Sequence, residues 1–241
     1  MPRGHARASD IAFVGLAVLT AVVFVCEIFF VFLVVPTEAR MGIVQKIFYF
    51  HVPSAYAMYL GATACFLGSV AYLARSSDLA DAIARAGAEA ACAFGSIVLT
   101  TGPLWGAKAW GAFWTWDPRL TTCLLSVLIY VAYLVLRSFA GDGEAERRFA
   151  AALGVLGAAN LPIIHFSVQK WGGQHPVVVT GNGGGLQHPA MRAGLAIGFC
   201  AFTLLAVLLV WLRVRLELAT ARFARAEQEA IDVDLDARTH A

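Results

Sequence analysis

Charged residues are scarce in this chain. Only 14% of its 241 residues are Asp, Glu, Lys or Arg, whereas 59% are hydrophobic and the mean hydropathy is +0.70. A soluble domain is typically about one-quarter charged and close to half apolar. The composition therefore excludes an ordinary soluble domain and predicts an integral membrane protein. The net charge of +2 says little about partners, and we expect none among nucleic acids.

Cysteine motifs are also missing. None of the five cysteines belongs to a C-x-x-C or C-x-x-C-H sequence. This argues against a disulfide framework, a thioredoxin-like redox pair and covalently attached c-type haem. All five lie in apolar stretches, so we expect them to be small buried residues. No nucleophile or acid–base pair indicates an enzyme, and two distant histidines do not supply the ligands of a zinc site.

Long hydrophobic runs, by contrast, fill most of the chain. A transmembrane helix needs about 20 mostly apolar residues. We predict a single all-α domain, 1–241, consisting of a bundle of six transmembrane helices and a charged cytoplasmic tail at 213–241. The first run is too long for the apolar region of a signal peptide, so it is expected to be a retained span. The predicted spans are 11–35, 54–74, 85–104, 119–137, 149–168 and 190–212.

The distribution of Lys and Arg predicts the orientation of the bundle. The two terminal tails and the second and fourth loops carry twelve of these residues, and the first, third and fifth loops carry six. We therefore expect both termini in the cytoplasm and the three odd-numbered loops outside. All three lysines fall on the outer side, so the bias rests on arginine alone.

The third loop, predicted at 104–118, has the most unusual composition. Four of the six tryptophans fall within twelve residues of it. An interfacial aromatic belt would spread Trp and Tyr over many helix ends on both faces, so we favour a platform for a planar, apolar ligand. The interleaved Gly106 and Gly111 would let an indole ring approach the backbone closely. If the run is helical, Trp110 and Trp114 share one face.

Several polar residues accompany these spans and loops. Asp117 and Arg119 flank Pro118, and two interpretations remain open for them. They could cap the fourth helix and pair with each other, or Arg119 could contact an anionic group of the ligand, because its planar fork suits carboxylates. His165, inside the fifth span, is expected to hydrogen-bond to neighbouring helices. Glu27, inside the first span, could pair with another helix or with a small partner subunit.

Two histidines lie in other loops on the predicted outer side. His51 precedes a helix among aromatic residues, and His175 follows Trp171-Gly-Gly-Gln; His188 competes with His175, because it lies in a second Gln-His-Pro tripeptide. A single interfacial histidine is more often structural. The convergence of two of them on the side of the tryptophans favours a metal site, since neutral imidazoles suit transition metals and haem iron commonly takes axial His.

The run from Trp105 to Thr121 resembles the tryptophan-rich WWD signature of haem-handling membrane proteins. With six spans in about 240 residues, the chain resembles the CcmC family of the cytochrome c maturation system over nearly its whole length. Phe50-His-Val-Pro53 resembles that family's first histidine motif, and the spacing Trp171-x-x-x-His175 resembles its second, which selects His175 over His188. The sequence departs from the family at Phe113, where relatives often have a further Trp, and at Lys170, where they tend to have a second aromatic residue. It also departs in the Gly-rich fifth loop, 181–185.

The resemblance implies that His51 and His175 are the axial ligands of a b-type, non-covalent haem, carried as transient cargo on the periplasmic side of the bacterial inner membrane. It implies that the protein presents this haem and delivers it to the haem chaperone CcmE, together with CcmD and the ABC transporter parts CcmA and CcmB. The implied haem-facing residues are Trp105, Trp110, Trp114, Trp116 and Asp117, with Arg119 beside them.

Three alternative functions fit the sequence less well. A haem-attachment factor of the CcsA or CcmF type resembles a longer chain with extra histidines inside the membrane, where this chain has only His165. A b-type electron-transfer cytochrome would need histidine pairs within its helices, and the sequence shows none. A solute transporter would have broken helices in matching halves, and no such symmetry is present.

Overall fold

The computed structural model describes residues 2–139, 143–176 and 185–239, and these are almost entirely helical. Six helices are long and apolar enough to cross a membrane, which confirms the predicted all-α bundle of six spans. The first helix continues into a π-helical turn, and a short 3-10 helix precedes the second. The elements are α1 (Pro2–Phe29), η1 (Phe30–Val34), η2 (Ile43–Ile47), α2 (Phe48–Arg75), α3 (Asp78–Trp110), α4 (Pro118–Phe139), α5 (Glu144–Trp171) and α6 (Pro189–Thr239).

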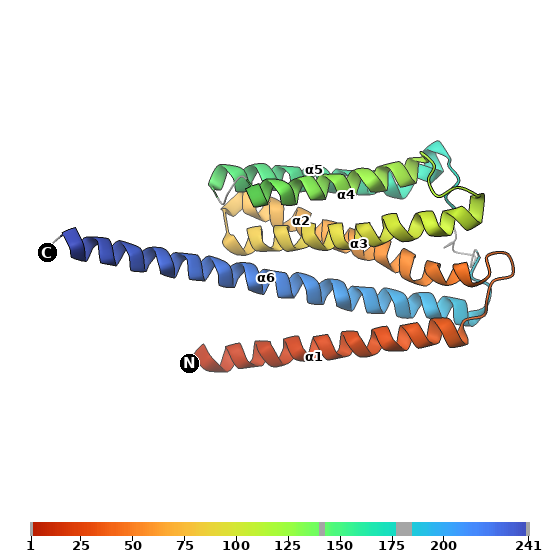
Figure 1. Ribbon diagram of the computed structural model, residues 1–241, viewed down its shortest axis with the longest axis horizontal. Coiled ribbons are helices and arrows are strands. Elements are labelled where there is room, and N and C mark those ends of the chain that lie inside the picture. Colours follow the sequence, from red (N-terminus) through yellow and green to blue (C-terminus); the bar gives the residue numbers. More distant parts are fainter. Residues whose placement is uncertain (1, 140–142, 177–184, 240–241) are drawn as a thin grey trace.

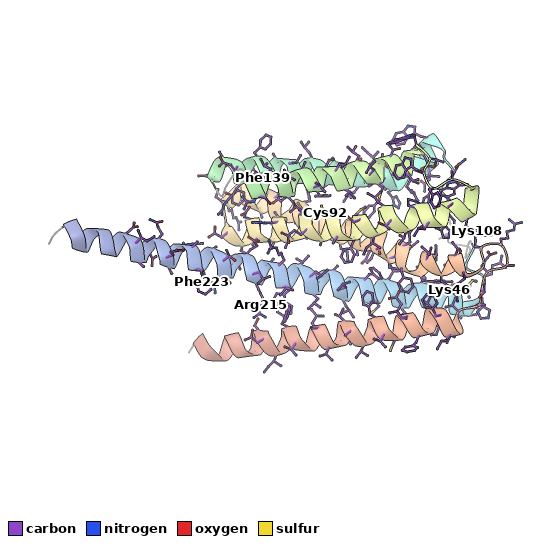
Figure 2. All side chains as sticks on the ribbon, viewed as in Figure 1. Lys46, Cys92, Lys108, Phe139, Arg215 and Phe223 are labelled. Atoms are coloured by element: carbon purple, nitrogen blue, oxygen red, sulfur yellow. The ribbon has the colours of Figure 1, made fainter. Side chains whose placement is uncertain are left out.

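The helices are longer than the predicted spans. In the charged tail predicted at 213–241, α6 continues as far as Thr239, and it runs without a break for 51 residues, or about 75 Å at 1.5 Å per residue. Its C-terminal part projects beyond the other helices, whereas Arg215 still lies beside α1, where it pairs with Asp10 (Figures 1 and 2). Charged residues such as Arg and Glu favour a helix, and the residues that break one are Pro and Gly. Neither Pro nor Gly follows Gly198, so nothing ends α6 where the charged residues begin.

Helices α2 to α5 form the compact part of the bundle, α6 lies along it, and α1 packs mainly against α6 (Figure 1). The closest crossing joins α2 and α3. A Cβ atom on Gly61, Gly68 or Gly87 would fall 2.6, 2.5 or 2.3 Å from a backbone nitrogen of the facing helix. Small residues permit such close backbone approach, which is how helices associate where no hydrophobic effect drives them together.

The two ends of the bundle differ in character. Both termini and the connections α2–α3 and α4–α5 lie at one end, and the other three connections lie at the opposite end (Figure 1). The end with the termini holds ion pairs, including Arg137 with Asp81 at 2.8 Å and Arg85 with Glu217 at 3.2 Å. The predicted first, third and fifth loops thus share one end, termed the loop end below.

Buried polar groups stabilise the first connection at the loop end. Lys46 is only 4% exposed, and its Nζ donates to the carbonyl oxygens of Val31 (2.7 Å) and Val35. These carbonyls belong to the end of the first span, so Lys46 ties that end to the start of α2.

Glu27 is fully buried beside Gly198 of α6, and its carboxylate oxygens have no hydrogen-bond partner in the described structure.

Candidate functional site

The first half of the tryptophan run is helical, which corrects the predicted loop at 104–118. Helix α3 continues through Trp105 to Trp110 and ends at Gly111, whose φ of +81° is the left-handed conformation typical of a helix C-terminus. The Trp110 ring folds back onto Gly106, where a Cβ atom would lie 2.5 Å from its Cζ2. Gly106 therefore allows the close ring approach expected from the sequence.

The four tryptophans form two edge-to-face pairs rather than one flat stack. Trp105 and Trp110 have ring centroids 5.8 Å apart at an interplanar angle of 71°. Trp114 and Trp116, in the loop that follows, are 5.6 Å apart at 83°. Trp116 is 76% exposed, whereas the other three are partly buried. Of the four rings, Trp116 alone is thus exposed at the surface, while its partner Trp114 is partly buried like the first pair.

His51 lies in the first turn of α2, and its ring is oriented by a residue of α3. Its Nδ1 is 2.8 Å from the hydroxyl oxygen of Thr101, and that hydroxyl donates to the Ile97 carbonyl at 2.7 Å. Because the Thr101 hydroxyl has one proton and gives it to Ile97, it accepts from His51. Nδ1 of His51 therefore carries the proton, and Nε2 keeps a lone pair for a metal.

His175 also carries its proton on Nδ1, but a backbone carbonyl fixes this tautomer. Its Nδ1 is 3.1 Å from the Pro176 carbonyl oxygen, which only accepts, so Nδ1 is again the donor and Nε2 again keeps its lone pair. Burial, and next the positive charge of Arg119, lower the pKa of His175 to about 4. The imidazole is therefore neutral at physiological pH, which is the form that binds metals.

The structure places the two histidines at the same end of the bundle, although 124 positions separate them in the sequence. His51 contacts Thr101, one turn before Trp105, and the backbone of His175 contacts Asp117, which follows the tryptophan run. Several buried donors nearby have no hydrogen-bond partner in the described structure: Trp105 Nε1, Trp110 Nε1, Thr115 Oγ1 and Arg119 Nε. Unpaired buried donors are costly, so this end of the bundle is suited to a ligand that carries acceptor groups.

Asp117 and Arg119 do not form the ion pair that one interpretation of the sequence allowed. Asp117 is 6% exposed, and its Oδ1 accepts from the backbone N–H of Arg119 (2.8 Å) and Leu120 (3.3 Å). Asp117 therefore caps α4, as that interpretation also expected. The Arg119 guanidinium donates instead to the His165 carbonyl oxygen at 3.0 Å, which places it between α4 and α5 near His175.

The remaining histidines are differently placed. His188 accepts a hydrogen bond at Nδ1 from the Ala190 N–H at 3.1 Å and caps α6, so in the neutral form its proton is on Nε2 and no lone pair remains for a metal. The His165 ring packs edge-on against Phe166. No side-chain hydrogen bond from the described residues reaches it, contrary to the expectation from the sequence.

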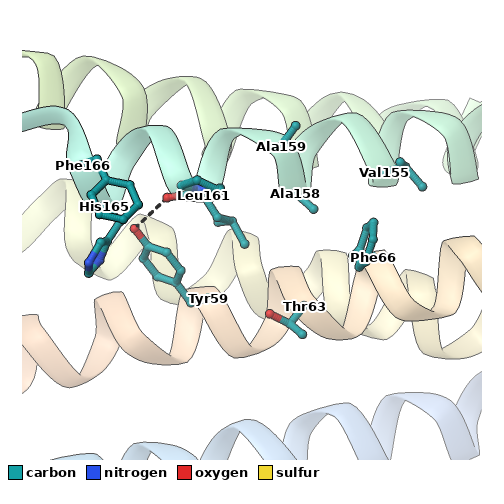
Figure 3. Close-up of a pocket in the computed structure, with 10 residues that line it drawn as sticks. Tyr59, Thr63, Phe66, Val155, Ala158, Ala159, Leu161, His165 and Phe166 are labelled. Atoms are coloured by element: carbon teal, nitrogen blue, oxygen red, sulfur yellow. Dashed lines mark hydrogen bonds between the residues drawn. The ribbon is translucent and has the colours of Figure 1, made fainter. Parts of the chain in front are cut away.

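His165 lines an open groove of about 600 Å³ between α2 and α5 (Figure 3). Apart from His165, Tyr59 and Thr63, the lining side chains are apolar. The Tyr59 hydroxyl donates to the Leu161 carbonyl at 3.4 Å beside the His165 ring (Figure 3). The groove lies along the apolar length of two spans, and neither His51 nor His175 lines it.

The described residues include no group of three His, Cys, Asp or Glu side chains that could hold a metal ion. Two neutral imidazoles beside aromatic rings suit a metal whose other ligands come from a planar macrocycle. Sequence reasoning missed Thr101, which orients His51. The available signal was its spacing of four residues from Trp105, which puts both on one face of α3. The Gly181–Gly185 stretch expected in the fifth loop lies outside the described residues, apart from Gly185.

These features define a multi-pass membrane protein that gathers two histidines and four tryptophans at one end of its helices. Residues 1–229 match the family described as Heme exporter protein C, and the chain belongs to this family, CcmC. It is thus a membrane component of a haem delivery system in cytochrome c maturation, not an enzyme.

Individual relatives agree with the family match. The chain is 36% identical over 188 residues to Heme exporter protein C of Bradyrhizobium diazoefficiens, covering 78% of this chain and 72% of the relative. It is 34% identical over 187 residues to the Escherichia coli K12 protein of the same name, covering 75% and 73%. A putative cytochrome c biosynthesis ccmC-like mitochondrial protein of Marchantia polymorpha is 30% identical over 195 residues, covering 81% and 83%.

Proposed function

We propose that the loop end binds one b-type haem non-covalently through Nε2 of His51 and Nε2 of His175, and presents it to the haem chaperone CcmE. The observation that carries the proposal is that both imidazole rings have the same tautomer. Each donates from Nδ1 to a fixed acceptor, and each keeps its Nε2 lone pair. A hydrogen bond from the second ring nitrogen to a fixed acceptor is the usual means of orienting a metal-bound imidazole.

The aromatic pairs and the buried donors suit the rest of the haem. Trp105 and Trp110 supply apolar surface for the macrocycle, and their unpaired Nε1 groups, with Nε of Arg119, are donors for its carboxylates. No covalent bond forms, so the cargo can leave when the two axial bonds break. The exposed Trp116 at the edge of the site is the surface that we assign to the chaperone.

The sidedness follows from the positive-inside rule. The end with both termini carries twelve of the eighteen Lys and Arg residues, so we place it in the cytoplasm and the loop end in the periplasm of a bacterial inner membrane. In this arrangement CcmD, CcmA and CcmB assemble with the helices, and CcmE meets the loop end.

The absorption spectrum of the purified protein tests the haem site. We expect a Soret band in the wild type that is strongly reduced in His51→Ala and in His175→Ala. His188→Ala is the matched control, because this histidine lies in the same loop but caps α6, and its haem content should equal that of the wild type. Equal losses in all three variants would contradict the assignment.

Delivery to the chaperone needs a separate test. Trp116→Ala should retain the Soret band while the transfer of haem to CcmE slows. The matched control is Phe139→Ala, because Phe139 is 86% exposed at the opposite end of α4 and should affect neither quantity. Normal transfer by Trp116→Ala would remove this residue from the docking surface.

A further inference from the structure

One carboxylate joins the tryptophan run to the loop of the second histidine. Oδ1 of Asp117 accepts the two N–H groups that cap α4. Oδ2 accepts from the backbone N–H of Gln174 (2.8 Å) and of His175 itself (3.3 Å). Four backbone donors, two from the first turn of α4 and two from the connection after α5, thus converge on one buried side chain. A residue that only started α4 would need Oδ1 alone.

We propose that Asp117 is a positioning residue that holds His175 in place, and not a residue that faces the cargo. The proposal rests on the assignment of His175 as a haem ligand. Both carboxylate oxygens are occupied by backbone N–H groups, and the side chain is 6% exposed. The sequence-based expectation that Asp117 belongs to the haem-facing platform is therefore replaced by a role through His175.

Only a carboxylate can make all four contacts. Each oxygen of Asp accepts two hydrogen bonds, and bonds to a charged acceptor are about twice as strong as neutral ones. Asn has a single acceptor oxygen. It can therefore cap α4 or hold the segment that carries His175 (172–176, the histidine loop), but not both. This difference provides a graded test, because Asp117→Asn should fall between the wild type and Asp117→Ala.

The histidine loop has a backbone that fits this contact. Gly172 and Gly173 follow α5 with φ values of +74° and +136°, conformations that L residues with side chains rarely adopt. A Cβ atom on Gly173 would lie 2.1 Å from Oδ2 of Asp117. The contact with Asp117 therefore also requires Gly173. Its lack of a side chain lets the backbone turn sharply after Trp171 and pass close to the carboxylate. Gly173→Ala disturbs this contact while leaving the α4 cap intact.

Hydrogen exchange in the haem-free protein tests the contact itself. In Asp117→Ala and in Gly173→Ala, the amides of Gln174 and His175 should exchange about tenfold faster, which corresponds to the loss of a hydrogen bond to a charged group. Glu38→Ala is the matched control. Glu38 is also a carboxylate at the loop end and accepts from the backbone N–H of Arg40 and Met41, but it does not contact the histidine loop. Unchanged exchange at 174 and 175 in both variants would overturn the proposal.

The ligation state of bound haem tests whether His175 still binds the iron when Asp117 no longer holds it. We expect Asp117→Ala and Gly173→Ala to convert six-coordinate, low-spin haem into the five-coordinate, high-spin form that is also expected for any haem retained by His175→Ala, and added imidazole to restore the low-spin spectrum. A general structural defect would lower the yield without selecting this spectrum. Six-coordinate haem in both variants would overturn the proposal. If His175→Ala itself leaves the spectrum unchanged, the ligand assignment fails, and the exchange experiment still decides whether Asp117 holds the loop.

Discussion

The hydrogen bond between His51 and Thr101 makes a quantitative prediction. In Thr101→Val the side chain keeps its shape but loses the hydroxyl that accepts the Nδ1 proton at 2.8 Å. The partly buried ring then has two options. It keeps Nδ1–H without a partner, or it moves the proton to Nε2 and gives up the lone pair that binds iron. Both options weaken the axial bond.

The size of the effect follows from the geometry. An unsatisfied buried donor costs about 1–3 kcal/mol, and the loss of the group that hydrogen-bonds a metal-binding histidine typically reduces metal affinity by about 10–100-fold. The two estimates agree, since a tenfold change in Kd is about 1.4 kcal/mol. We therefore expect Thr101→Val to weaken haem binding about 10–100-fold. We also expect it to raise the reduction potential of the iron, because an imidazole without this hydrogen bond is a poorer electron donor.

The assay is a haem titration of the apoprotein in detergent, followed at the Soret band, with a redox titration of the loaded protein. Thr100→Val is the matched control. Thr100 neighbours Thr101 and donates to the Ser96 carbonyl at 2.8 Å in the same way, but it is exposed and does not contact His51. Equal Kd values and equal potentials in the two variants would refute the reasoning.

Three further predictions concern protonation and packing. The charge of Arg119 helps to lower the pKa of His175, so Arg119→Gln should raise this pKa and protonate the ring at a higher pH than about 4, as histidine NMR of the apoprotein would show. Gly106→Ala should displace the indole packed on it and cost about 1 kcal/mol, or roughly fivefold in haem Kd. Gly87→Ala places a Cβ atom 2.3 Å from backbone and should destabilise the α2–α3 pair by about 1–3 kcal/mol, seen as a lower Tm. Gly15→Ala, with open space around it, should change neither haem Kd nor Tm.

Much of the architecture could be predicted from the chain alone. Six spans follow from apolar runs of transmembrane length, because a helix in lipid satisfies its own backbone hydrogen bonds. Alternation of the spans then puts the tryptophan run, His51 and His175 at one end, as the structure does. Helix ends were less predictable. The third helix extends to Trp110 because Gly111 supplies its C-terminal turn, and α6 continues past Trp211 because nothing breaks it.

The chemistry of the site depended on contacts between distant parts of the chain. Fifty positions separate His51 from the hydroxyl that orients it, and 57 positions separate Asp117 from the amide of Gln174. No local pattern encodes such pairs, because they arise from helix packing. Spacing from Trp171 and resemblance to the family chose His175 over His188, and the structure adds a physical reason: His188 uses Nδ1 to cap α6.

The sequence by itself thus determined the kind of protein, the number of spans and the end at which the unusual residues collect. These properties depend on hydropathy and on the order of segments, both of which can be read along the chain. Only the tertiary structure decided which imidazole nitrogens are free, which tryptophans pair and what Asp117 contacts. Those properties depend on where protons and lone pairs point, and a direction in space exists only after the helices have packed.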